Sequence, residues 1–588
     1  MSQVKSFETN QAPTQFGIGQ PVRRTEDTRF LRGQGRYSDD ITLDNQAYGF
    51  VVRSSVAAGR INRLDISAAL AMPGVRLVLT GADLDAADAN HVPCRVQLQN
   101  RDGSAAPMPK RPVLATDVVR YVGEAVAFVV ADTFAQARAA GEAVELDCDY
   151  GAAVVATATA DAPGQPQVHP QAPGNIAFDW HHGDVDATQK AFAGAARVFT
   201  LDLVNNRVVA NPMEPRAANA VWDPHAGKLT MYTGTQGGWT LRDTLAKKSL
   251  KVAPENVRVV TPDVGGGFGM KVFVYPEHLM VGFAARACGR PVKWTGERAE
   301  SFLSDVMGRD HVTHAELALD GDHRITGLRV VTRANMGAQL SQFAPYIPTG
   351  GALKVVTGIY AIKNLSYQVL GLFTNTTPVD AYRGAGRPES IYMIERLVDK
   401  AARQCGIDPA AFRKLNLISA AAMPYVPAAG ETYDTGEFAA ILDASVARAG
   451  LEGFADRRAS AARDGKRLGV GLGCYIESTM GDPNEYADIR FADGEVTVMV
   501  GTQSNGQGHE TAYAQVLADK LGVDFDSIRV VMGDTDAIPS GGGTGGSRSL
   551  TVQAAAINVT GDQVIDKARE LAGQDMEVSA VDIVFGAG

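Results

Sequence analysis

The chain has 588 residues, of which 45% are apolar and 62 are glycine, so we expect two to four domains of a globular, loop-rich enzyme. The 56 basic and 66 acidic residues give a net charge of −10 without any Lys/Arg block, which argues against nucleic acid and anionic membranes as partners. The five cysteines are scattered and never spaced as CxxC, which argues against a disulfide framework and an iron–sulfur cluster. No apolar run is long enough for a membrane span or a signal peptide, and we therefore expect a cytoplasmic location.

The first predicted unit covers residues 20–150. Apolar strands are expected at 125–130 and 143–150, with a helix near 133–143 between them. The segment 161–175 then contains four prolines and two glycines, a composition typical of a linker. The sequence therefore predicts a separate N-terminal domain that ends before this segment.

An internal repeat follows. "KLTMYTGTQ" (228–236) and "EVTVMVGTQ" (495–503) are both alternating strands that end in Gly-Thr-Gln. After each come a helical stretch and then an Arg-Val-Val strand that leads to three glycines, at 240–250 and 257–267 in the first copy and at 511–521 and 528–543 in the second. Two similar halves are therefore predicted, with facing Gly-rich loops and a crevice of the kind where ligands bind.

The Gly-rich loops do not match the common nucleotide or metal motifs. Met270 and Thr511 stand where the third glycine of a dinucleotide-binding loop would be, and no P-loop occurs. Tyr513 occupies the position of the second histidine of a zinc-binding HExxH helix. Bare backbone N–H groups and a helix that begins near Glu510 remain, and these suit a large, anionic, oxygen-rich ligand.

A third Gly-rich segment, "GGGTGGSRSLTVQAAA" (541–556), leads into Ser547, Arg548 and Ser549 at a predicted helix start. Two hydroxyls and one guanidinium suit phosphate recognition. The alternative interpretation of this segment is a flexible surface loop.

A collinear series of motifs resembles one family. It includes "RRTEDTRFLRGQGRYSDDI" (23–41), "MEPR" (213–216), "DVGGGFGMK" (263–271) and "DAYRGAGRPE" (380–389), followed by "GQGHE" and "GSRS". The chain is similar to the molybdopterin-binding large subunit of the xanthine dehydrogenase, aldehyde oxidase and aerobic carbon monoxide dehydrogenase family.

The resemblance implies an α+β fold in three parts. Residues 20–155 would form an α/β hammerhead domain. A duplicated domain that binds the molybdenum cofactor would follow, with its first half at 165–425 and its second half, truncated, at 430–588. The implied cofactor is molybdenum–molybdopterin cytosine dinucleotide.

The resemblance also assigns site residues. The molybdenum would be held by the pterin dithiolene, so that no protein atom binds the metal directly. Gln236 and Arg383 would be catalytic, although a structural salt bridge is an equal alternative for Arg383. The residues expected to contact the cofactor are Gln236, Gly266, Gly267, Phe268, Gly269, Arg383, Gln507, Gly508, His509, Glu510, Thr544, Ser547, Arg548 and Ser549.

Val272, Gly384 and Ala385 are expected to line the substrate pocket. Carbon monoxide oxidisers of the family carry a copper-binding cysteine where this chain has Gly384. Purine oxidisers carry an aromatic residue at the position of Ala385 and a glutamate at that of Val272. The sequence therefore favours oxidation of aldehydes or N-heterocycles with water as the oxygen donor, with carbon monoxide oxidation as the alternative; Val272 could also simply pack in a core.

The family's general-base glutamate belongs to a C-terminal stretch without a counterpart here, and neither Glu389 nor Glu510 matches its motif. The expectation is a truncated reading frame or one piece of a split subunit, with a catalytically incomplete cofactor-binding fragment as a third hypothesis. The partners that the resemblance implies are a FAD-binding medium subunit, a [2Fe–2S] small subunit and a separate C-terminal piece of the large subunit.

Overall fold

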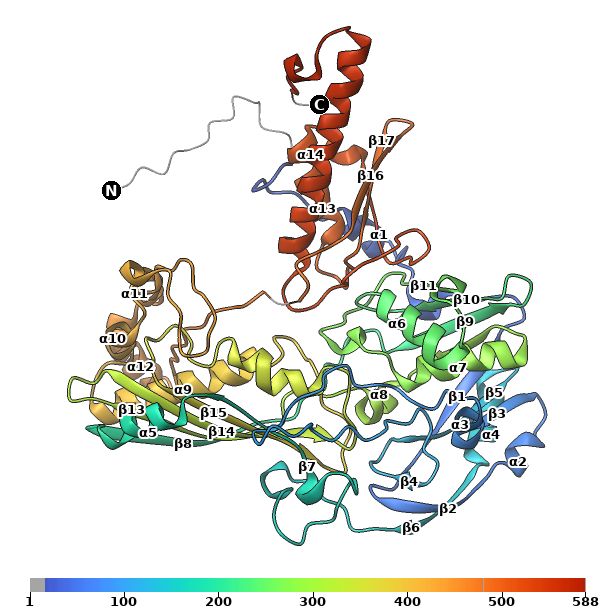
Figure 1. Ribbon diagram of the computed structural model, residues 1–588, viewed down its shortest axis with the longest axis horizontal. Coiled ribbons are helices and arrows are strands. Elements are labelled where there is room, and N and C mark those ends of the chain that lie inside the picture. The colour runs from blue at the N-terminus through green and yellow to red at the C-terminus, as the bar shows by residue number, and fades with distance from the viewer. Residues whose placement is uncertain (1–15, 480, 587–588) are drawn as a thin grey trace.

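The computed structural model describes residues 16–479 and 481–586 and has a mixed α/β architecture (Figure 1). Two sheets with their helices form a broad base, and the second half of the predicted cofactor domain stands on it. No helix in the described ranges is long and apolar enough to cross a membrane. The shorter or peripheral helices are α2 (Ser67–Leu70), α3 (Gly81–Ala86), α5 (Val185–Ala193), α8 (Arg298–Ser304), α10 (Pro409–Asn416), α11 (Phe438–Ala449) and α12 (Phe454–Arg463).

One sheet of seven strands joins the N-terminal segment to the first half of the predicted cofactor domain, in the order β11-β10-β9-β12-β1-β5-β3. The strands are β1 (Ala47–Arg53), β3 (Val75–Thr80), β5 (Ala125–Ala131), β9 (Ala217–Asp223), β10 (Lys228–Thr233), β11 (Val257–Val260) and β12 (Val292–Thr295). The junction is the parallel pairing of β1 with β12, which places Ala47 opposite Val292. The N-terminal segment thus shares a sheet with the first half, a contact that the sequence did not predict, since pairing between strands far apart in the chain leaves no local pattern.

Strand β5 explains why this sheet needs helices on both faces. All seven of its residues are buried. Phe128 packs in the core under α7 (Pro276–Cys288), and Val129 packs in the core under α4 (Phe134–Glu142). The predicted strand at 125–130 and the helix near 133–143 are confirmed, and the predicted strand at 143–150 is present as β6 (Glu145–Tyr150), which forms a small sheet with β2 (Gly59–Asp65) and β4 (Val118–Val119).

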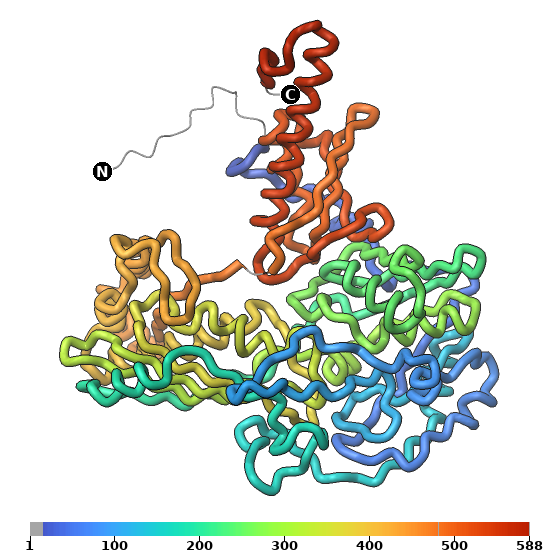
Figure 2. Tube along the Cα trace, viewed as in Figure 1, coloured from blue at the N-terminus to red at the C-terminus, as the bar shows by residue number. Residues whose placement is uncertain are grey.

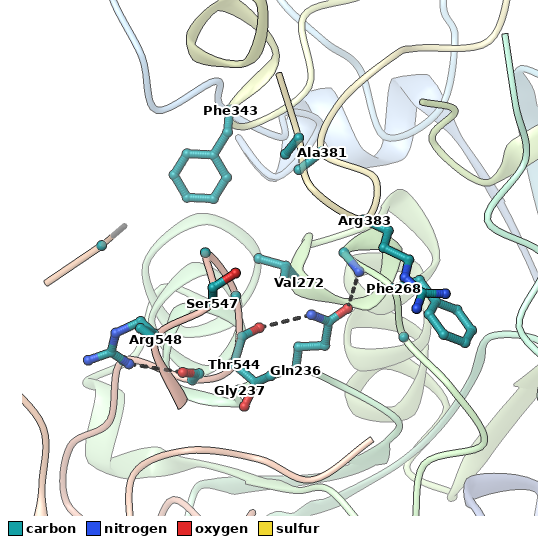
Figure 3. A pocket seen from close by; sticks show the side chains of 18 of the residues that line it. Gln236, Gly237, Phe268, Val272, Phe343, Ala381, Arg383, Thr544, Ser547 and Arg548 are labelled. Atoms are coloured by element: carbon teal, nitrogen blue, oxygen red, sulfur yellow. Dashed lines mark hydrogen bonds between the residues drawn. The ribbon is translucent and has the colours of Figure 1, made fainter. Parts of the chain in front are cut away.

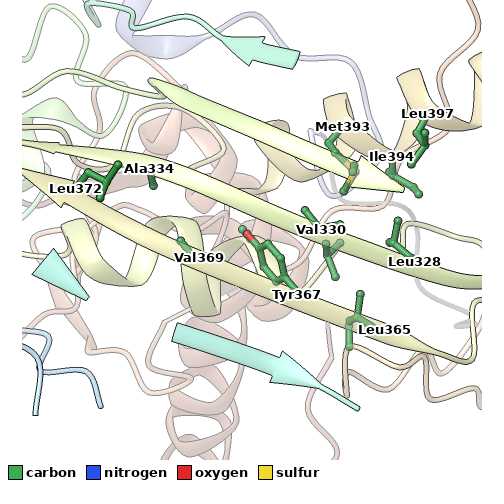
Figure 4. Close-up of a cluster of buried hydrophobic side chains, with 14 of the residues drawn as sticks. Leu328, Val330, Ala334, Leu365, Tyr367, Val369, Leu372, Met393, Ile394 and Leu397 are labelled. Carbon is green, nitrogen blue, oxygen red and sulfur yellow. The ribbon is translucent and has the colours of Figure 1, made fainter. Parts of the chain in front are cut away.

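A second sheet carries the rest of the first half, in the order β7-β15-β14-β13-β8. Its strands are β7 (Ile176–Gly183), β8 (Arg197–Asn205), β13 (His311–Leu319), β14 (Ile325–Gly337) and β15 (Leu365–Phe373). Helix α9 (Arg387–Cys405) packs on it, and Ile394 and Leu397 contribute to the same apolar core as Leu328 and Val330 (Figure 4). Val168 and Ala172 join this core, so the predicted linker is packed against the sheet rather than free.

The predicted repeat is confirmed. In the first half β10 pairs antiparallel with β9 and parallel with β11, and in the second half β17 pairs in the same way with β16 and β18. Each central strand is followed by a helix, which is α6 (Trp239–Thr244) with a π-helical continuation to Leu250 in the first copy and α13 in the second. The second-half elements are β16 (Ala487–Ala492), β17 (Glu495–Val500), α13 (His509–Leu521), β18 (Ile528–Val531) and α14 (Ser549–Asp575).

The two halves meet edge to edge through residues that follow β11 and β18. The amide of Thr261 donates to the carbonyl of Gly533 at 2.7 Å, and Arg258 pairs with Asp534 at 2.5 Å. The indole of Trp239 donates to a carbonyl of the second half at 2.9 Å. Helix α1 (Thr25–Leu31) leaves the N-terminal region and lies against the second half (Figure 2).

A buried ion network lies where the N-terminal region meets the first half. The Arg216 guanidinium, 3% exposed, donates to Glu277 at 2.8 Å and to Asp305 at 2.6 Å, and its charge lies 3.7 Å from the Tyr275 ring centroid. Arg53 from β1 also pairs with Glu277, at 2.7 Å, whereas Arg216 is the cation that pairs with Asp305 in the described ranges. Because both carboxylates are buried, their charge is balanced by these two guanidinium groups.

We expect Arg216→Ala to cost about 3–5 kcal/mol in the free energy of unfolding, since it leaves the buried Asp305 carboxylate without its cation and Glu277 with Arg53 alone. The measurement is the urea midpoint at neutral pH. Arg138, whose pair with Glu142 is 49% and 65% exposed, is the matched control, and Arg138→Ala should cost less than about 1 kcal/mol. Equal shifts for the two variants would contradict this account of the network.

Candidate cofactor and substrate site

A cleft of about 460 Å³ lies between the two halves, beside the first-half loop at residues 381–387 (Figure 3). Both halves contribute Gly-rich loops to it, as the repeat predicts. The sequence-predicted residues that line it are Gln236, Gly267, Phe268, Gly269, Val272, Arg383, Gly384, Ala385, Gln507, Thr544, Ser547 and Arg548. Gly266, Gly508, His509, Glu510 and Ser549 lie behind these residues and do not line the cleft.

Gln236 connects the two halves at the floor of the cleft. Its side-chain oxygen accepts from the Gly269 amide at 2.8 Å, and its Nε2 donates to the Thr544 carbonyl at 2.8 Å. These partners fix which end of the amide is oxygen, because a backbone N–H can only donate and a carbonyl can only accept. The second Nε2 hydrogen stays available to a ligand in the cleft.

The first Gly-rich loop is held from behind by a buried ion pair. Lys271 lies 2.6 Å from Glu214, and the same carboxylate accepts from the Gly265 amide at 2.9 Å. Burial lowers the pKa of Lys271, and the Glu214 charge opposes this shift. A Cβ atom at Gly267 would lie 2.6 Å from Oε1 of Gln236, so only glycine lets the loop approach this side chain.

The loop that carries Arg383 is fixed by another arginine. Arg309 donates to the carbonyls of Tyr382 and Arg383, at 2.7 Å and 2.6 Å, and pairs with Glu389 at 3.2 Å. The Arg383 side chain is exposed and lies 6.0 Å from the Phe268 ring centroid. It forms no ion pair within the described ranges, so the structural salt bridge proposed as its alternative role is not seen there.

The second Gly-rich loop places an unpartnered acceptor in the cleft. The Oδ1 atom of Asn505 is buried without a hydrogen bond, while its Nδ2 donates to the Thr235 carbonyl at 3.0 Å. Helix α13 begins at His509, two residues before the predicted start at 511. Burial lowers the pKa of His509 to about 4, so its ring, packed 4.9 Å from that of Tyr513, is neutral at pH 7.

The third loop differs from the expectation of a guanidinium free to bind phosphate. Arg548 is 3% exposed and donates to Glu485 at 2.6 Å as well as to backbone carbonyls of both the loop and the connecting segment. Its donors are already used, because the segment near Glu485 folds onto the loop. The Ser547 hydroxyl donates to Glu477 at 2.6 Å, and that of Ser549 to Thr544 at 3.0 Å.

Sequence reasoning missed an apolar wall of the cleft. Phe343, Tyr346 and Ile347 line it, and the Phe343 ring lies 6.3 Å from that of Phe273. They come from a short 3-10 helix (Ala344–Tyr346), which Phe343 precedes, and from the π-helix that follows it (Ile347–Gly351). The sequence of this segment shows no motif or periodicity. Val272 lines the cleft and also packs beside Phe273. Its predicted position in the pocket and its alternative role in packing therefore do not exclude each other.

Arg387 and Glu477 were also missed as cleft-side residues. Arg387, 4% exposed, pairs with Glu477 at 3.2 Å and donates to the Ser478 carbonyl at 2.8 Å. Arg387 belongs to the quoted motif at 380–389, but the pattern gave no sign of its partner in the connecting segment.

The site fits a large, oxygen-rich cofactor. In the described part of the chain the amides of Gly267 and Phe268 form no protein hydrogen bond, and Asn505 offers an unpaired acceptor. Gln236 adds a free donor. Such a mixture of donors and acceptors around a Gly-lined cleft matches the polar edges of a pterin and its phosphate.

Family models agree with this geometry. Residues 168–417 and 445–588 each match the molybdopterin cofactor-binding domain, and residues 32–150 match the α/β hammerhead domain of aldehyde oxidase and xanthine dehydrogenase.

Individual proteins match over nearly the whole chain. The carbon monoxide dehydrogenase large chain of Hydrogenophaga pseudoflava is 34% identical over 95% of this chain and 72% of its own length. The nicotine 6-hydroxylase large subunit of Paenarthrobacter nicotinovorans is 33% identical over 97% and 70%. The crystal structure of quinoline 2-oxidoreductase from Pseudomonas putida 86 superposes with a TM-score of 0.90 at 31% identity, over 97% of this chain and 73% of that one. The chain therefore belongs to the molybdopterin-binding large subunits of the xanthine dehydrogenase and carbon monoxide dehydrogenase family of molybdenum hydroxylases.

Proposed function

We propose that this subunit binds molybdenum–molybdopterin cytosine dinucleotide and oxidises aromatic aldehydes or N-heterocycles, with water as the oxygen donor. The observation that carries the substrate class is the apolar wall of Phe343, Tyr346, Ile347 and Val272. Aromatic and aliphatic side chains bury a planar ring favourably, whereas a purine would require polar partners on this side. The names of two relatives, a nicotine hydroxylase and a quinoline oxidoreductase, support the same class.

The chain's own residues position the reactants. The free Nε2 hydrogen of Gln236 would donate to an oxygen of the cofactor, and Arg383 would orient substrate or cofactor by a charge-assisted hydrogen bond. The bound cofactor would supply the redox chemistry. The direct contacts we propose come from Gly267, Phe268, Gly269, Gln507, Thr544 and Ser547.

The remaining predicted residues act without a direct cofactor contact in this proposal. Arg548 holds its loop through Glu485, and Ser549 supports Thr544. Gly266, Gly508, His509 and Glu510 shape the two loops. Gly384 and Ala385 leave room at the substrate end.

The electrons released in the oxidation require acceptors. We propose separate FAD-binding and [2Fe–2S] subunits as partners. The support is the family membership and the relatives that are named as subunits of complexes. The cytoplasmic location expected from the sequence stays a prediction.

Carbon monoxide oxidation is the second candidate, favoured by 34% identity to a carbon monoxide dehydrogenase. The position of Gly384 weighs against it. This residue has φ +92°, and a Cβ atom there would lie 2.3 Å from Cγ of Pro388. A copper-binding cysteine therefore does not fit this loop conformation.

The first test is the content of molybdenum and released CMP per chain, measured by mass spectrometry on protein purified with its natural subunits. We expect near-stoichiometric values of both, followed by turnover in a screen of aromatic aldehydes and N-heterocycles. Absence of both, with the cofactor-insertion machinery present, would contradict the proposed cofactor.

Gln236→Leu should lower the molybdenum content to below about a tenth of wild type. The Gly269 amide and the Thr544 carbonyl at the cleft floor would each lose a hydrogen bond, at a cost of about 1–3 kcal/mol. Gln503 is the matched control. It holds the equivalent position in the repeat, but its Nε2 donates only to the neighbouring Ser504 carbonyl. Unchanged molybdenum in Gln236→Leu, or an equal fall in Gln503→Leu, would refute the role of Gln236.

Phe343→Ala should raise KM for an aromatic substrate about tenfold, since roughly 1–2 kcal/mol of ring contact is lost. We expect a much smaller change in kcat. Steady-state kinetics on the best substrate of the screen decide the point, with Phe491→Ala, a ring 55% exposed on β16, as the control.

For carbon monoxide oxidation we expect copper no higher than in a buffer blank and no oxidation of the gas. Metal analysis and a dye-reduction assay with carbon monoxide measure the two. Stoichiometric copper with carbon monoxide turnover would make the second candidate the function.

A further inference from the structure

Helix α1 carries one arginine that contacts both halves of the cofactor domain from outside the cleft. Arg29 Nη1 lies 2.5 Å from Oδ2 of Asp263, and its Nη2 lies 2.7 Å from Oε1 of Glu510. Asp263 belongs to the first half and Glu510 to the second. One guanidinium thus bridges the two repeats.

Asp263 and Glu510 each lie next to one end of a Gly-rich loop that lines the cleft. Asp263 lies two residues before Gly265, where the first Gly-rich loop begins. It is itself fixed by Arg36, whose amide donates to Oδ2 at 2.8 Å and whose carbonyl accepts from the Asp263 amide at 3.0 Å. Glu510 lies in the first turn of α13, directly after the second Gly-rich loop.

A second set of contacts holds α1 against the residues that directly follow the second Gly-rich loop. The Thr511 hydroxyl donates to Glu26 at 2.6 Å and accepts from the Thr25 amide at 2.9 Å. A Cβ atom at Gly508 would lie 3.6 Å from Oε1 of Glu26, so α1 is in close contact with the loop itself. Movement of α1 would therefore move the loop.

The negative charges at this junction require a cation between Asp263 and Glu510. Burial, together with the nearby charges of Glu26 and Asp263, raises the pKa of Glu510, and Arg29 opposes that shift. Arg24 lies 4.0 Å from Glu26, and Arg36 and Arg529 line the same cavity as Asp263 and Glu510. In the described ranges, however, only Arg29 forms an ion pair with Asp263 and Glu510. Without its guanidinium these two carboxylates would face each other across the junction of the halves, and their repulsion would push the loops apart.

We propose that Arg29 is a positioning residue that sets the separation of the two cofactor loops. The inference rests on the proposed cofactor site for its functional meaning, but the coupling of the loops is a property of the chain alone.

The test uses the full chain with its natural subunits and compares wild type with Arg29→Ala. Two quantities are measured from pH 8 downward, in steps to the acid limit at which the protein stays folded. They are the rate of molybdenum loss and the hydrogen exchange of the amides at 265–269 and 506–509. We expect both to increase roughly tenfold over wild type in the variant at pH 8, because a partly buried charged bridge is lost, and the increase to shrink as the pH falls, because protonation of Glu510, whose pKa is raised, relieves the repulsion.

The controls separate charge from structure. Arg32 is exposed, follows the same helix and has no side-chain partner in the described ranges, so Arg32→Ala should resemble wild type at every pH. The double variant Asp263→Asn, Glu510→Gln removes the ion pairs without exposing like charges, so the ratio of its exchange rates to those of wild type should exceed one and stay the same at every pH. Arg29→Lys keeps the charge but cannot bridge both carboxylates as a fork, and should give intermediate values.

Unchanged exchange in both loops of Arg29→Ala would overturn the proposal. If that variant does not assemble, Arg29→Lys decides, and wild-type exchange in Arg29→Lys would overturn it equally. Faster exchange in both loops of a protein whose wild type holds no molybdenum would support the bridge and refute the proposed cofactor.

Discussion

The site depends on one side-chain amide that is bonded to both halves of a duplicated fold. Gln236 accepts from Gly269 in its own half and donates to Thr544 in the other. The repeat places Gln503 at the equivalent position, yet Oε1 of that residue has no partner and its Nε2 turns to the adjacent Ser504. Duplication thus gives the two halves the same backbone arrangement. The two glutamines form different hydrogen bonds, so the two sides of the cleft differ chemically.

The rigidity of that frame comes from buried charge placed behind the loops. Glu214 and Arg216 belong to one short motif, and they bind different partners. Glu214 holds Lys271 and the backbone of the first Gly-rich loop, whereas Arg216 neutralises Glu277 on α7. Buried ion pairs add little net stability but allow few alternative arrangements, since any other packing would leave a charge unpaired. The motif therefore specifies where the loop lies.

Local patterns predicted much of this structure. The order of strand, helix and Gly-rich loop in both repeats could be predicted from the sequence, because the alternation of apolar and polar residues and the clusters of glycine reflect backbone conformation directly. Several features could not be predicted. The pairing of β1 with β12, the rings of Phe343 and Tyr346, and the use of Arg548 by Glu485 all depend on tertiary contacts between segments without periodicity. A motif identifies a residue that matters, but its partners decide whether it faces a ligand or the protein.

The docking of α1 on the second half has a consequence for biosynthesis. Thr25 and Thr511 are 486 positions apart. At about 5–20 residues per second, a ribosome needs roughly 25–100 s after making α1 before α13 is available. During that interval the sheets of the base can fold while α1 lacks its partners in the second half, so the two cofactor loops are brought together last. Insertion of a bulky ligand into the nascent protein would then precede closure of the cleft rather than require its reopening.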